Sequence, residues 1–208
     1  SGWAPVPPVS MPEDWEDARL GQARALLVAF RKRFPACFRT IPTAEHLNKP
    51  RSVPRTLSYL ARVTACWEAS GTNSDVLRLL AKGLVGPGVG GDFLNFYKTR
   101  ELIPSPVEIL ASPMTVEIPE ERGDLCYLMF CSVAAHVLQF PTVENWKAAW
   151  ALIGRTEGTR AIAHSALAAR TLAGLLRQQQ GSKLRKHIPQ EARIFTEIFR
   201  EIGALSSN

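Results

Sequence analysis

The chain has 208 residues, of which 46% are hydrophobic, and it carries a formal net charge of +6 with a pI near 9.4. This length and apolar content suit one large or two small globular domains with a substantial core. No apolar run approaches the roughly 18 residues that a membrane span needs, and the N-terminus has neither a basic start nor an apolar secretory segment, so we expect a cytoplasmic protein.

The first twelve residues are rich in proline, which favours extended backbone. We therefore interpret residues 1–12 as a linker, and a linker implies a preceding part of the protein. From Glu13 to Pro35, apolar residues recur at helical spacing and predict a first helix. Its last turn holds the basic triplet Arg31, Lys32 and Arg33, where cations suit the helix dipole.

A polar, proline-containing loop follows at 40–55, and residues 55–70 predict a second helix that Gly71 ends. Residues 74–85 predict a third, amphipathic helix. We expect the following residues of this helix to face the core: Val76, Leu79, Leu80, Gly83 and Leu84.

Gly86, Gly88 and Gly91 have the G-x-G-x-x-G spacing of a dinucleotide-binding loop. That motif requires a buried strand before it, whereas here a predicted helix precedes the glycines. No G-x-x-x-x-G-K-[ST] motif occurs in the chain either. The stretch therefore predicts a glycine-rich turn between two helices and no nucleotide site.

The connector at 103–119, which has room for one helical turn and a short extended piece, is the candidate boundary between two helical halves, 13–113 and 114–208. Residues 124–140 are apolar almost all round and predict a helix buried on most sides. Thr142 is the expected N-cap of the next helix, whose predicted inward stripe is Val143, Trp146, Ala149, Trp150 and Ile153.

Further helices are predicted at 159–178 and at 189–203, with a cationic loop at 181–187 between them. The last helix should bury Phe195, Ile198, Phe199 and Ile202. Because no β-alternating run of useful length occurs, the predicted class is all-α, with about eight helices.

The sequence shows no complete active site. The four cysteines lack C-x-x-C spacing and lie in separate apolar surroundings, which predicts buried free thiols and neither disulfides nor zinc. The four histidines are scattered, and we expect His136 to be a partly buried structural residue. Carboxylates cluster only at 117–124, which is typical of a solvated loop or a helix start.

Two basic segments are candidate partner or anion-binding surfaces. The first contains Arg31, Lys32 and Arg33, and the second contains Lys183, Arg185 and Lys186. Their charge permits nucleic acid as a partner, but helix-turn-helix, zinc-finger and aromatic-interleaved patterns are all missing from the sequence. A cationic solvated surface is therefore the favoured interpretation.

In 51-RSVPRTL-57, Pro54 can occupy the first position of a helix and Arg55 the second. Free backbone N–H groups and the positive end of the helix dipole lie there, so the Arg55 guanidinium is suited to receive an anion, above all a phosphate. The alternative is an arginine that merely lines the start of a helix.

Four ordered segments resemble the helical lid and C-terminal part of MoxR-like AAA+ ATPases. They are 24-RALLVAFRKRFPACF-38, 50-PRSVPRTLSYLARV-63, 84-LVGPGVGGDFLNFY-97 and 103-IPSPVEILASP-113. The similarity covers residues 12–113 well, and residues 119–204 more loosely resemble the helical tail of some bacterial members. No P-loop, acidic magnesium-binding motif or arginine finger is visible, so the resemblance implies a fragment with its ATPase core upstream, or a stand-alone lid-like protein.

In this resemblance Arg55 matches the sensor-two arginine, which reaches the γ-phosphate of ATP. Val53 departs from the family pattern, because a small polar residue usually precedes the Pro-Arg pair. The implied parent binds ATP and magnesium, although this chain alone holds no cofactor and is not catalytic. The implied partners are the upstream core, neighbouring subunits of an oligomer and a client protein in chaperone-like remodelling. The alternative is a helical scaffold, unrelated to ATP, that binds protein or nucleic acid through its basic segments.

Overall fold

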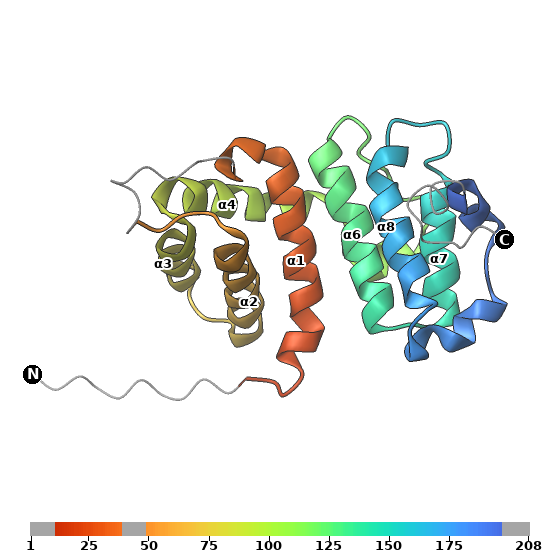
Figure 1. Ribbon diagram of the computed structural model, residues 1–208, viewed down its shortest axis with the longest axis horizontal. Coiled ribbons are helices and arrows are strands. Elements are labelled where there is room, and N and C mark those ends of the chain that lie inside the picture. Colours follow the sequence, from red (N-terminus) through yellow and green to blue (C-terminus); the bar gives the residue numbers. More distant parts are fainter. Residues whose placement is uncertain (1–10, 39–48, 197–208) are drawn as a thin grey trace, which may run out of the picture.

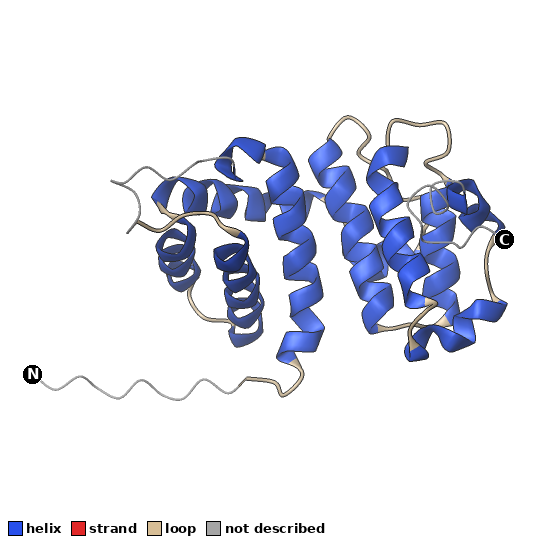
Figure 2. Cartoon of the chain, viewed as in Figure 1, coloured by secondary structure: helices blue, strands red, loops and turns tan. Residues whose placement is uncertain are grey.

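The computed structural model describes residues 11–38 and 49–196. Within these ranges the chain forms α-helices and short 3-10 helices without any strand, which confirms the predicted all-α class (Figures 1 and 2). The α-helices are α1 (Trp15–Arg33), α2 (Pro54–Ser70), α3 (Ser74–Val85), α4 (Pro87–Thr99), α5 (Pro106–Ala111), α6 (Gly123–Gln139), α7 (Val143–Gly154) and α8 (Ile162–Leu175). The 3-10 helices are η1 (Pro35–Phe38), η3 (Arg100–Leu102), η4 (Gln179–Lys186) and η5 (Gln190–Phe195).

Helices α1 to α4 enclose a first core that is centred on Phe30 of α1. The Phe30 ring lies 5.6 Å from that of Phe93 and 5.7 Å from that of Phe96, both on α4. Leu60 and Ala61 of α2 complete this core from the other side. The buried residues of α1 include Ala25, Leu26, Ala29 and Phe30, which belong to the apolar pattern that predicts this helix.

The predicted inward face of α3 is wrong except at Leu84, which is partly buried against the first core. Val76, Leu79 and Leu80 are exposed by 42%, 70% and 44%, and the buried face is formed by Leu77, Ala81 and Val85. Helix α3 carries apolar residues on two neighbouring faces. Its contacts with α2 and α4 bury the face that contains Leu77, Ala81 and Val85. The other face remains an apolar strip in solvent.

Only Gly86 forms the turn between α3 and α4. Its φ of 92° lies in the region that favours glycine. Pro87 then begins α4, so that Gly88, Gly90 and Gly91 are helical residues and the predicted glycine-rich turn is shorter than expected. Gly90 is the glycine on which the packing depends, because a Cβ there would lie 2.8 Å from the Cα of Lys82 on α3.

The second core lies among α5 to α8 and the 3-10 helices η4 and η5. Helix α6 has ten buried residues, which confirms that it is covered on most sides. The Thr142 hydroxyl caps α7 by accepting from the backbone N–H of Asn145 at 3.1 Å. The Trp146 and Trp150 rings of α7 lie 5.6 Å apart, and Phe195 packs against Trp150 at 6.2 Å.

The end of the described chain differs from its prediction. Residues 190–195 form the 3-10 helix η5, and an α-helical residue appears only at Thr196, the last described position, although Phe195 is buried as expected. Ile198, Phe199 and Ile202 lie outside the described residues, as does nearly all of the predicted linker at 1–12.

The two cores meet along α1 and α6, which lie side by side at the centre of the molecule (Figure 1). Gly21 of α1 allows a close approach, because a Cβ there would lie 3.4 Å from the Cβ of Ala135 on α6. The Gln22 side chain donates to the backbone oxygen of Ser132 at 2.9 Å, and Leu128 of α6 belongs to the first core. None of the described helices combines the length and apolar character that crossing a bilayer demands.

Candidate functional site

The start of α2 has the local structure that the sequence predicts. Val53 is extended, with φ of −122° and ψ of 162°, and Pro54 occupies the first helical position. Val53 has no side-chain acceptor, so no side chain caps the first N–H groups of the helix. The Thr56 hydroxyl accepts from the backbone N–H of Val53 at 3.0 Å and fixes the entry of the chain.

Arg55 lies at the second position of α2 with an exposed side chain. Its Nε donates to the Tyr59 hydroxyl at 3.4 Å, and its guanidinium carbon lies 5.8 Å from the centre of the Tyr59 ring. The same hydrogen bond raises the pKa of Arg55 and lowers that of Tyr59. The guanidinium is thus held along the surface of α2, away from the core.

Two polar atoms beside this helix start are buried without a hydrogen-bond partner. They are Nη1 of Arg51 and Oγ of Ser52. Buried polar groups are paired in most proteins, so orphan donors mark positions where a ligand or partner atom can bind. Sequence reasoning missed both residues, since only the folded chain shows which side of the extended segment is covered.

The basic triplet at the end of α1 is divided among three environments. Arg31 borders the groove between α1 and α2. The Arg33 guanidinium lies 5.9 Å from the centre of the Phe34 ring. Lys32 points to the other half of the molecule, where its Nζ is 2.8 Å from Nδ1 of His164. The triplet therefore does not form one cationic surface.

Lys32 joins α1 to α6 and α8. Its ammonium group donates to His164 on α8 and lies 4.8 Å from the centre of the Tyr127 ring on α6. His164 accepts this hydrogen bond only as a neutral imidazole, and burial together with the nearby Lys32 charge lowers its pKa. Gly123 leaves room for the ring, because a Cβ there would lie 2.8 Å from Nε2 of His164.

The lowered pKa of His164, caused by burial and then by Lys32, predicts a loss of stability in acid. The unfolded chain takes up a proton on this histidine near its ordinary pKa, whereas the folded chain does so only at lower pH. The stability that the neutral His164 side chain contributes to the folded chain is therefore complete above about pH 7. It is lost as the pH falls through the pKa that His164 has in the folded state. His164→Gln keeps an acceptor for Lys32, so its urea midpoint should fall less than that of the wild type between pH 7.5 and 5.5.

His136→Gln is the matched comparison, because burial also lowers the pKa of His136 but no lysine lies against it. Its ring packs against Phe140 at 4.9 Å, as expected for a half-buried structural histidine. An equal fall of the urea midpoint in the wild type and in the His164→Gln variant would contradict the lowered pKa of His164.

The second basic segment is structured, contrary to the predicted loop. It forms η4, which Leu184 anchors by full burial, while Lys183, Arg185 and Lys186 are exposed. Arg185 Nε donates to the backbone oxygen of Leu176 at 2.8 Å. In Figure 1 the end of α1 lies at the upper edge and η4, in blue, lies beyond the lower end of α8, so the two basic segments do not meet.

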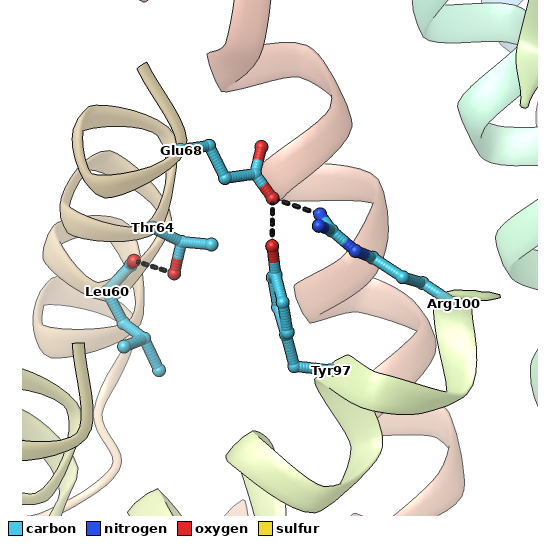
Figure 3. Close-up of polar contacts among 5 residues, drawn as sticks. All are labelled: Leu60, Thr64, Glu68, Tyr97 and Arg100. Atoms are coloured by element: carbon cyan, nitrogen blue, oxygen red, sulfur yellow. Dashed lines mark hydrogen bonds and ion pairs between the residues drawn. The ribbon is translucent and has the colours of Figure 1, made fainter. Parts of the chain in front are cut away.

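A largely buried carboxylate that the sequence did not single out holds α2 to α4 (Figure 3). The Tyr97 hydroxyl donates to Oε1 of Glu68 at 2.6 Å, and Arg100 donates to the same oxygen. The Arg100 guanidinium also covers the Tyr97 ring at 4.0 Å. Burial, and then Glu68, raises the pKa of Tyr97, so this hydroxyl stays protonated. The arrangement is that of a structural ion pair.

The carboxylate run at 117–124 is not wholly solvated, because Asp124 is buried at the start of α6. Arg122 donates to both of its oxygens, at 3.1 and 2.9 Å. Burial alone would raise the pKa of Asp124, but Arg122 and the backbone N–H groups outweigh it and hold the pKa below its usual range. The pair lies at the start of α6, where a carboxylate in the first turn suits the helix dipole.

The described cysteines are free thiols, as predicted, although Cys126 alone is fully buried. In the described part of the chain, no three side chains of histidine, cysteine, aspartate or glutamate are grouped so that they could hold a metal ion. Comparisons with protein-family models, with curated proteins and with solved structures found no significant match to this chain. The geometry at the start of α2 therefore carries the functional argument.

Proposed function

We propose that this chain is the all-α lid and C-terminal helical extension of a MoxR-like AAA+ ATPase, in which Arg55 contacts the terminal phosphate of ATP held by an upstream core. The observation that carries the proposal is the exposed guanidinium at the uncapped start of α2. Free N–H groups, the helix dipole and a fixed positive charge all favour an anion at this point.

The position of Arg55 also suits transfer of motion. Helix α2 packs along α1 and α3, so that a force on the guanidinium would act on the first core as one body. Hydrolysis, by removing the terminal phosphate, would release that contact and allow the lid to swing relative to the core. Remodelling of a client protein is the process that such a swing would drive.

Replacement of Arg55 tests the proposal in the full-length parent protein. Arg55→Ala should lower the rate of ATP hydrolysis about a hundredfold, because it removes one charged donor from the transferring phosphate. Arg55→Lys should recover part of this loss, since it keeps the charge but not the planar fork. Steady-state turnover and nucleotide affinity are the measurements.

Arg78→Ala is the matched control. Arg78 is an exposed arginine on α3 whose Nη2 lies 2.9 Å from Asp75, far from the start of α2 in sequence. Both alanine variants should melt at the wild-type temperature, because exposed substitutions change stability little. Unchanged hydrolysis and affinity in Arg55→Ala would rule out the sensor role.

The alternative, a scaffold that binds nucleic acid through its basic segments, has less support. Nucleic-acid binding gains affinity from many phosphate contacts on one surface. Lys32 is occupied within the molecule, and the two basic segments lie at separate places in Figure 1. We therefore assign the free cations of α1 to a different kind of partner below.

A further inference from the structure

One row of α1 residues projects between two grooves. It comprises Arg24, Val28 and Arg31, at the i, i+4, i+7 spacing of a single helix face, and we call it the α1 ridge; Leu27, between them, is buried in the first core. A groove of about 410 Å³ separates the ridge from α2, and a groove of about 630 Å³ separates it from α6 and α8. Arg24 and Val28 border both grooves.

The walls of the two grooves are largely apolar. Leu57 and Ala61 line the α2 side, and Leu138 and Leu167 line the side of α6 and α8. Val28 on the ridge is 42% exposed and Leu167 is 36% exposed. Covering these exposed apolar side chains with a partner would be favourable, because it removes apolar surface from water.

The charge along the ridge has one sign. Among the described residues, no aspartate or glutamate lines either groove, and neither Arg24 nor Arg31 forms an ion pair or a hydrogen bond. Seven residues of helix place the two arginines about 10 Å apart along the axis. Ser52 also lines the groove on the α2 side, and its hydroxyl is buried without a hydrogen-bond partner.

We propose that the α1 ridge and its two grooves dock an acidic amphipathic helix of a partner protein. Two carboxylates one heptad apart on that helix would meet Arg24 and Arg31, and the apolar residues between them would cover Val28 and enter the grooves. Nucleic acid fits less well, because its interface needs many phosphate contacts and offers little to an apolar ridge. The site does not include Arg55 and does not depend on ATP.

A designed peptide pair tests this proposal on the chain itself. The probe is a labelled helical peptide of about 16 residues with glutamates at i and i+7 and leucines at i+3 and i+4, and the control peptide carries lysines in place of the glutamates. Fluorescence anisotropy should show that the acidic peptide binds at least about tenfold more tightly than the basic one, and less tightly at higher salt.

Charge reversal locates the site. The double variant Arg24→Glu/Arg31→Glu should bind the acidic peptide at least about tenfold more weakly and the basic peptide more tightly. Arg78→Glu on α3 should leave the affinity for both peptides unchanged. Val28→Ser should lower the affinity for the acidic peptide without altering the melting temperature of the protein. Equal binding of the two peptides, binding unaffected by the double reversal, or displacement of the peptide by single-stranded nucleic acid at equal charge would each overturn the proposal.

Discussion

Gly90→Ala should lower the free energy of unfolding by about 2 kcal/mol, although alanine is the better helix former. The new Cβ would lie 2.8 Å from both the Cα and the backbone N of Lys82, and 3.0 Å from the carbonyl carbon of Ala81. These are backbone atoms, so no side chain can rotate away and α3 must move from α4. Urea unfolding followed by circular dichroism measures the change.

Gly91→Ala is the matched control one residue further along α4. A Cβ at Gly91 would meet no atom within 4 Å. The substitution should therefore raise stability by about 0.5–1 kcal/mol, the usual gain when alanine replaces glycine inside a helix. If both variants shift the urea midpoint in the same direction, the close approach of α3 and α4 at Gly90 is wrong.

Glu68→Ala should cost about 2 kcal/mol of stability. The Glu68 side chain is 10% exposed, and its removal leaves both the Tyr97 hydroxyl and the Arg100 guanidinium without their acceptor. The Arg100 side chain is 40% exposed, so solvent offsets part of the loss, and the expected cost is below that of a fully buried ion pair.

Glu16→Ala provides the comparison, because the Glu16–Arg62 pair at 3.2 Å is exposed on both sides. Its loss should change stability by less than about 1 kcal/mol. A double-mutant cycle with Tyr97→Phe isolates the contact with Glu68, since Phe keeps the ring under Arg100 and removes only the hydroxyl. A cost for Glu68→Ala no larger than that for Glu16→Ala, with no coupling to Tyr97, would refute a stabilising network.

Strong local signals in the sequence predicted most of the helices. Pro54 begins α2, Gly71 ends it in the left-handed conformation, and the Thr142 hydroxyl caps α7. The face of α3 could not be predicted in the same way, because Leu77 and Leu79 are both apolar and lie on opposite sides of the helix. Only packing against α2 and α4 determines which of them is buried.

In the candidate site, too, local features could be predicted from the sequence and long-range contacts could not. The position of Arg55 at the start of a helix follows from the proline before it, so local sequence was sufficient. The partners of Glu68 lie 29 and 32 residues away, and Lys32 meets His164 across 132 residues. No short-range pattern encodes such contacts, so from sequence alone Lys32 is expected to belong to a cationic surface.

A fragment ending at residue 113 would retain α1 to α5 but would remove α6, which covers one side of α1. The flank of α1 at Gly21 and Gln22, which now lies against α6, would face water, and Leu128 would be missing from the core around Phe30. Extending the fragment through α6 would cover α1 again, but it would expose the side of α6 that packs against α8 in the whole chain. Such truncated pieces should therefore self-associate when expressed, and dissection of this protein is better done by point substitution.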